Sequence, residues 1–143
     1  MNSSVKTVYI AGPITGDPHY REKFHEAEMA LIMAGLIPLN PADIMSPLDA
    51  NGVDYNVILA CCLNLVKTCD AIAMMPGWRN SKGAKAELNR YCQSRSPWEC
   101  VLYDLDMYPN PTSKANKYST IITRYDGLNA WRNEHCWDNL SCV

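Results

Sequence analysis

The 143-residue sequence lacks a long hydrophobic run, a block of basic residues and the cysteine spacings of metal sites. No apolar stretch approaches the ~20 residues that a membrane-spanning helix needs, and residues 1–6 do not resemble a signal peptide. Lysine and arginine total 13 against 15 acidic residues, which leaves a net charge of −2. Nucleic acid and anionic membranes are therefore disfavoured as partners, and we expect a cytoplasmic protein.

Seven cysteines are present, but none forms a CxxC pair or a Cys/His cluster at zinc spacing. Their number is odd, which does not suit a complete set of disulfides. Most of them fall in apolar segments, where a free cysteine commonly acts as a small buried hydrophobic residue. We therefore expect no metal site.

Apolar segments that are typical of strands alternate with helical patterns over roughly the first hundred residues. Such alternation implies a parallel sheet with right-handed crossovers. We predict a three-layer α/β/α fold of flavodoxin-like or Rossmann-like type, with a four- or five-stranded parallel sheet. Strands are expected at 5–11, 36–39, 71–75 and 98–103, and helices at 19–34, 54–67 and 81–94.

The other segments are less regular. A turn is expected at 40–43 and a loop at 45–52, while 118–125 fits either a fifth strand or a short helix. We divide the chain into an α/β domain at 1–104 and a C-terminal extension at 105–143. The extension is expected to pack on the body of the protein or on a partner subunit.

The most informative segment is 70–87, with the sequence DAIAMMPGWRNSKGAKAE. A short apolar strand ends at a Pro-Gly pair, and a polar loop then opens a helix at Ser81. Ligands of α/β sheets bind at the carboxyl ends of parallel strands, and the free N–H groups of a helix start attract anions such as phosphate. Glu87 lies between one and two turns into the helix, beside the small residues Gly83 and Ala84. This pattern predicts a carboxylate that is open to an anion-binding pocket.

Several of these residues also have structural explanations. Ser81 suits a helix N-cap whatever the ligand, and Tyr9 on the first strand fits either the core or the site. Trp78, expected to be exposed at a strand end, could stack on a base or cover the sheet edge. Asp70 is expected to fix local backbone. The loop at 12–16 lacks the Gly-Lys-Ser/Thr of a nucleotide-triphosphatase loop, so ATP hydrolysis is not expected.

Two segments together resemble the nucleoside 2-deoxyribosyltransferase superfamily, which includes the 2′-deoxynucleoside 5′-phosphate N-hydrolases. Residues 8–16, VYIAGPITG, look like its opening strand and loop. The pattern Ser81-x-Gly83-x-x-x-Glu87 looks like its catalytic helix. The resemblance covers about 5–103 and extends to small phage and bacterial proteins. It implies a place in the cytoplasm of a bacterial or phage-infected cell.

The resemblance also implies roles for individual residues. In that superfamily the helix glutamate attacks the anomeric carbon of a deoxyribonucleoside or its 5′-phosphate, and the sugar passes to another base or to water. Glu87 would be the nucleophile, with Tyr9 as its catalytic positioner. Ser81 falls where the N-hydrolases have a phosphate-binding serine, which favours a nucleotide over a free nucleoside. The other candidate substrate-binding residues are Gly12, Pro13, Gly16, Trp78, Gly83 and Ser119.

One position departs from the superfamily pattern. Its enzymes carry a second catalytic aspartate eight residues before the position of Asp70, and here that residue is Cys62. A cysteine cannot replace an aspartate that orients a hydroxyl or shuttles a proton near neutral pH. Asp43 or Asp17 could serve as the acid instead, or the base could depart with little help. The remaining possibility is a protein that binds nucleotides without cleaving them.

The sequence therefore predicts cleavage or transfer at the N-glycosidic bond of a 2′-deoxynucleoside or its 5′-monophosphate through Glu87. No metal or organic cofactor is needed for such chemistry, and a two-step displacement would retain configuration. Superfamily members pair subunits to complete the pocket, so a homodimer or higher homo-oligomer is expected, in which Ser119 could reach a neighbour's phosphate. Two alternatives stay open: a nucleotide-sequestering protein of the same fold, and a glycohydrolase of NAD-type dinucleotides.

Overall fold

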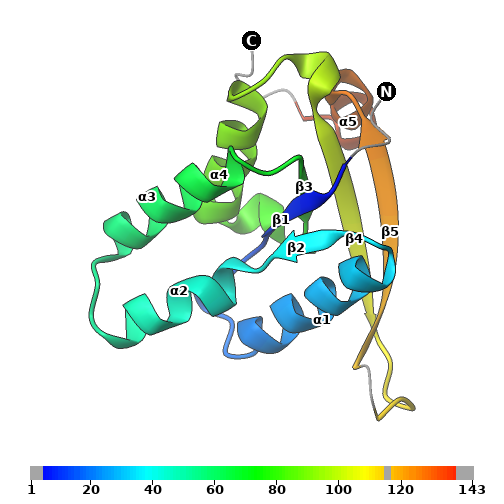
Figure 1. Cartoon of the computed structure of the whole chain (residues 1–143). Helices are drawn as coiled ribbons and strands as arrows, with labels where there is room; N and C mark the ends of the chain where they lie inside the picture. The colour runs from blue at the N-terminus through cyan, green and yellow to red at the C-terminus, as the bar shows by residue number, and fades with distance from the viewer. Residues whose placement is uncertain (1–4, 115–116, 138–143) are drawn as a thin grey trace.

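A computed structural model describes residues 5–114 and 117–137 and has a five-stranded sheet in the order β2-β1-β3-β4-β5 (Figure 1). Neighbouring strands from β2 to β4 run parallel, and β5 runs antiparallel to β4. The predicted α/β/α class is confirmed. Residues 118–125, which fit either a fifth strand or a short helix by sequence, belong to strand β5, and this strand is antiparallel to its neighbour. The strands are β1 (Thr7–Ala11), β2 (Ile37–Leu39), β3 (Ala71–Met74), β4 (Val101–Pro109) and β5 (Tyr118–Asp126).

Helices cover both faces of the sheet. α1 packs on one face, and α3, α4 and α5 pack on the other. α2 lies at the border and contributes Ala42 to one core and Met45 to the other. The helices are α1 (Tyr20–Met33), α2 (Pro41–Ala50), α3 (Tyr55–Val66), α4 (Lys82–Gln93) and α5 (Leu128–His135), with short 3₁₀ turns at Trp78–Asn80 and Pro97–Glu99.

The first strand sorts its side chains between the two cores. Successive strand residues point to opposite faces of a sheet. Val8 and Ile10 accordingly belong to the core beneath α1, together with Phe24. Tyr9 belongs to the opposite core, with Leu88 of α4. The phenol of Tyr9 therefore faces the layer that holds α3 and α4.

The segment between residues 40 and 52 corrects the sequence-based expectation. It was expected to form a turn and a loop, and it forms α2 instead. The side chain of Asn40 caps the helix by accepting a hydrogen bond from the Ala42 N–H at 3.0 Å, and Pro41 occupies the first turn, where no N–H is needed. Pro47 lies inside the helix, where proline is unfavourable, and this is why the sequence pattern favoured a loop.

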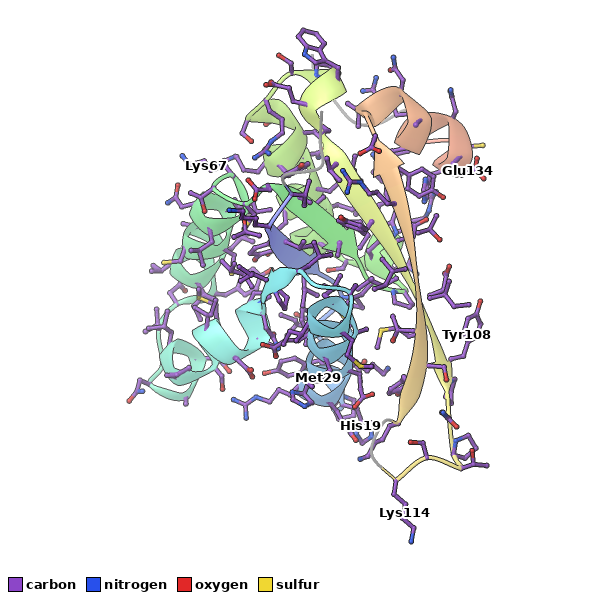
Figure 2. All side chains as sticks on the ribbon, turned by 45° about the vertical axis from the view of Figure 1, so that its right-hand side comes forward. His19, Met29, Lys67, Tyr108, Lys114 and Glu134 are labelled. Carbon is purple, nitrogen blue, oxygen red and sulfur yellow. The ribbon has the colours of Figure 1, made fainter. Side chains whose placement is uncertain are left out.

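Residues after 104 complete β4 and add β5 and α5. Leu128 and Trp131 of α5 are almost fully buried in the same core as Tyr9. The β4–β5 hairpin reaches past the other strands (Figure 1), and Tyr108 lies on its side away from Met29 of α1 (Figure 2). The strand expected to start at residue 98 begins at Val101, after a 3₁₀ turn. None of the helices in the two described ranges has the length and hydrophobicity that crossing a membrane requires.

Candidate active site

A cavity of about 640 Å³ opens at the carboxyl ends of the first three strands. Its walls come from the loop after β1, from α2, from α3 and from the start of α4. These are the elements that follow β1, β2 and β3, so the cavity occupies the position at which open α/β sheets bind ligands. The sequence-based prediction of a pocket at the start of the 81–94 helix agrees with this geometry.

Glu87 lines this cavity and has only 7% of its surface exposed. Its helical neighbours Gly83 and Ala84 line the cavity as well, and neither has a side chain long enough to screen the carboxylate. A Cβ at Gly83 would come 3.4 Å from the hydroxyl of Tyr55, so the missing side chain leaves room for that phenol. The carboxylate therefore lies at the floor of an open pocket.

Tyr9 contacts the Glu87 carboxylate directly. Its hydroxyl donates a hydrogen bond to Glu87 Oε2, and its ring is completely buried. Burial and the nearby Glu87 carboxylate raise the pKa of Tyr9 far above its ordinary value, so the phenol keeps its proton. Burial raises the pKa of Glu87 to about 8, although the hydrogen bond from Tyr9 opposes the rise. At neutral pH Glu87 is therefore mostly protonated.

Cys62 of α3 completes the floor of the cavity. Its side chain lines the pocket, is 7% exposed and lies close to the Tyr9 hydroxyl. Burial raises the pKa of the Cys62 thiol to about 11. A neutral thiol thus stands next to Tyr9 and Glu87, where the superfamily pattern implied a second carboxylate. Because it adds no negative charge near neutral pH, it does not oppose ionisation of Glu87.

The start of α4 forms one wall. Ser81 Oγ accepts a hydrogen bond from the Ala84 N–H at 3.1 Å, so the expected N-cap role of Ser81 is confirmed. The first N–H groups of a helix have no intrahelical partner, and here the residues that carry them, Lys82 and Gly83, line the cavity. Together with the helix dipole, these groups favour an anion at this wall.

The first loop contributes Gly12 and Pro13 to the lining. A Cβ at Gly12 would lie 2.8 Å from both Cβ and Sδ of Met75, so glycine is required there by close packing against the end of β3. Gly16 does not line the cavity; its φ of +85° belongs to the left-handed region that glycine adopts readily. The structure thus gives Gly16 a role in the loop geometry.

Trp78 corrects another expectation. It is only 7% exposed, so the prediction of an exposed ring is wrong. The ring packs against Trp131 with centroids 5.8 Å apart and against Trp137 with centroids 5.0 Å apart. Trp78 is absent from the lining of the cavity among the described residues. The aromatic residues of the C-terminal segment cover it, and sequence periodicity could not reveal this contact.

Ser119 lies on β5 and lines a different hollow, of about 350 Å³, between α1 and the β4–β5 hairpin. Within one chain it is therefore not brought together with Glu87. Its contact with a neighbouring subunit stays a prediction. Asp70, in contrast, behaves as expected: its carboxylate accepts hydrogen bonds from the N–H groups of Lys6 at 2.9 Å and Thr7 at 3.0 Å and fixes the backbone there.

Neither of the two aspartates proposed as substitute acids lines the cavity. Asp17 forms an ion pair with Lys23 at 2.8 Å, and Asp43 lies on α2 outside the lining. Sequence analysis missed Asp49, which does line the cavity from α2. The Asn-Pro pair at 40–41 was the available signal, because it is typical of a helix start and would have placed Asp49 on a helix.

One family model matches the part of the chain that contains this whole site. A comparison with functionally curated proteins found no match. The family model matches residues 6–96, from the start of β1 to just beyond α4. This match spans more than half of the chain and includes every element that lines the cavity. The chain therefore belongs to the family described as a domain of unknown function, DUF4406.

Proposed function

We propose that this protein cleaves, or transfers across, the N-glycosidic bond of a 2′-deoxynucleoside or its 5′-monophosphate, with Glu87 as the nucleophile. The observation that carries the proposal is the buried Glu87 carboxylate at the floor of a cavity whose wall is the start of α4. The resemblance to the nucleoside 2-deoxyribosyltransferase superfamily supports the same chemistry, and it rests on residues 8–16 together with the Ser81-x-Gly83-x-x-x-Glu87 pattern.

The reaction would proceed in two displacements. In the first, a Glu87 oxygen forms a bond to C1′ of the sugar, the C1′–N bond breaks, and its electron pair leaves with the base, which takes a proton from solvent. Positive charge develops on the sugar during this step, and a carboxylate stabilises it. Only ionised Glu87 can attack. With a pKa of about 8, roughly a tenth of the molecules carry the reactive form at pH 7.

The anion end of the cavity suits a single phosphate. Among the described residues, Lys82 is the one cationic side chain of the lining. Arg79, which is close in sequence, instead places its guanidinium 5.0 Å from the centroid of the Trp78 ring and bonds the His135 carbonyl. One lysine and one helix start match a 5′-monophosphate better than a di- or triphosphate. Binding that phosphate would place the sugar near Glu87 and supply several kcal/mol of the barrier.

The direct test is to incubate the protein with each deoxynucleoside and each 5′-monophosphate and to measure free base by chromatography. We expect wild type to release base and Glu87→Gln to release none. Glu134→Gln, on the exposed side of α5, is the matched control and should retain full activity. Absence of base release from every substrate would refute the proposal, and release of nicotinamide from NAD would favour the dinucleotide alternative.

One observation favours a second function. Cys62 supplies a neutral thiol where the superfamily has an acid, and a buried Glu87 that is mostly protonated at pH 7 can hold a ligand without attacking it. A protein of this kind would bind a nucleotide and keep it intact. Calorimetry would show tight binding of a nucleoside monophosphate, while chromatography over hours would show the same nucleotide unchanged.

A further inference from the structure

The cavity has a second carboxylate besides Glu87. Asp49 lies near the end of α2, which lines the cavity with its first residue, Pro41, and with Ala42, Met45, Ser46 and Asp49. The last four of these positions follow the i, i+3, i+4, i+7 pattern, so they share one face of the helix. Asp43 falls between them and lies off this face, which agrees with its absence from the lining. The fold of α2 thus presents Asp49, and not Asp43, to the pocket.

The contacts of Asp49 distinguish it from several other aspartates of the described chain. In the part of the chain that the structure describes, its carboxylate has no ion pair and no hydrogen bond, and the residue is exposed. The others have local structural partners. These are Lys23 for Asp17, the Asn40 side chain for Asp43, the Asn56 N–H for Asp54 and the N–H groups of Lys6 and Thr7 for Asp70.

The proposed chemistry leaves one role unfilled. After the first displacement Glu87 is an ester of the sugar and cannot accept a proton. Tyr9 is completely buried, and its hydroxyl is directed at Glu87. Cys62 is a neutral thiol, since burial raises its pKa to about 11. Asp49 is then the carboxylate of the lining that is free to take a proton from an incoming molecule.

We infer that Asp49 is the general base of the second displacement, an assignment that rests on the proposed function. The oxygen of a water molecule forms a bond to C1′. The C1′–O bond to Glu87 breaks, and its electron pair restores the Glu87 carboxylate. One proton of the attacking water passes to Asp49 and then to solvent.

The charges along the cavity are consistent with an anion site at α4 and a separate general base on α2. Lys82 and the start of α4 lie on the wall that attracts an anion, while Asp49 comes from α2. Because a phosphate and the Asp49 carboxylate carry like charge, we expect the phosphate at the start of α4 and not beside Asp49. The acceptor can approach the exposed carboxylate of Asp49 from solvent.

Asp49→Asn separates the two half-reactions. General-base catalysis contributes about 10²- to 10⁴-fold, so steady-state turnover should fall by about that factor. The first displacement should persist, because the nucleophile is intact. We expect a rapid burst of one base per protein molecule, followed by slow turnover. Mass spectrometry of the quenched protein should then find a deoxyribosyl group on the peptide that contains Glu87.

An external nucleophile gives the second readout. Azide needs no general base, so azide should restore turnover of Asp49→Asn and yield the deoxyribosyl azide. The matched control is Asp43→Asn on the same helix, which should show wild-type turnover and no adduct. If Asp49→Asn turns over like wild type, or loses the burst together with turnover, Asp49 is not the base. If wild type releases no base at all, the proposed function fails first.

Discussion

The Tyr9 hydroxyl donates a hydrogen bond to Glu87 Oε2, which joins the first strand to the fourth helix across 78 positions of sequence. Both groups are buried, and burial raises the pKa of each of them. The pair therefore couples the stability of the fold to the protonation of the residue that we propose as the nucleophile. This coupling makes pH the most informative variable in the experiments that follow.

Glu87→Gln should change how stability depends on pH. The pKa of Glu87 is raised from 4.5 to about 8, so its contribution to stability is fully present below pH 4.5 and is lost as pH rises towards 8. Over this window the unfolded chain has released a proton that the folded chain retains. The free energy of unfolding of wild type should fall by about 1.4 kcal/mol per pH unit at most from this group.

The glutamine variant cannot titrate, so its stability should exceed that of wild type progressively more from pH 5 to pH 8. Urea unfolding at several pH values measures the difference. Glu134→Gln should show no such trend. A constant difference between Glu87→Gln and wild type across this range would show that Glu87 has an ordinary pKa.

Tyr9→Phe should shift the pH dependence of activity to higher pH. The hydrogen bond from Tyr9 lowers the pKa of Glu87, so its removal raises that pKa above about 8. A hydrogen bond to a charged group contributes about 1.5–3 kcal/mol, and base release at pH 7 should fall about tenfold or more. The loss should be smaller at pH 9. The exposed Tyr108, replaced by Phe, is the control; an equal loss of activity at every pH would contradict the assigned role of Tyr9.

Trp78→Ala should reduce stability without weakening ligand binding. The ring is buried against Trp131 and Trp137, and truncation of a buried tryptophan costs about 3–5 kcal/mol. Because Trp78 does not line the cavity, nucleotide affinity of the folded protein should change less than about twofold. Calorimetry and thermal unfolding measure the two effects. A large loss of nucleotide affinity at unchanged stability would show that Trp78 contributes to the binding site.

Gly12→Ala should destabilise the protein through a contact with Met75. The new Cβ would lie 2.8 Å from Met75 Cβ and Sδ, and overpacking of this kind costs about 1–3 kcal/mol. Met75→Ala removes the Sδ contact but leaves Cβ in place. The double variant should therefore recover part of the loss, which a double-mutant cycle measures. Additive effects of the two substitutions would show that the contact is absent.

The alternation of strands and helices could be predicted from the sequence because local patterns carry it. β1, α1, α3 and α4 all lie within a few residues of their expected positions. α2 could not be predicted in the same way, because Pro47 opposes a helix locally and the packing of Ala42 and Met45 in the two cores overrides it. Long-range contacts, not local propensity, decide such a segment.

The residues of the candidate site also fall into those that local spacing brings together and those that long-range contacts bring together. Glu87, Ser81 and Gly83 stand on one helix, so their spacing alone brought them together. Asp49 could be placed only together with α2. The Asn-Pro pair at 40–41 is a signal for the start of that helix, but Pro47 argues against its continuation as far as Asp49. The burial of Trp78 depends on Trp131 and Trp137, more than fifty positions away, and no periodicity in the sequence encodes that meeting.

The contact between Trp78 and the C-terminal aromatic residues has a consequence for the site. Trp78 precedes Ser81 by one turn of 3₁₀ helix, so the rings that cover it also brace the start of α4. These rings lie beyond residue 96, where the family match ends. A protein shortened to the shared domain would lose this cover of Trp78 together with β4, β5 and α5, so we expect it to unfold more readily than the full chain.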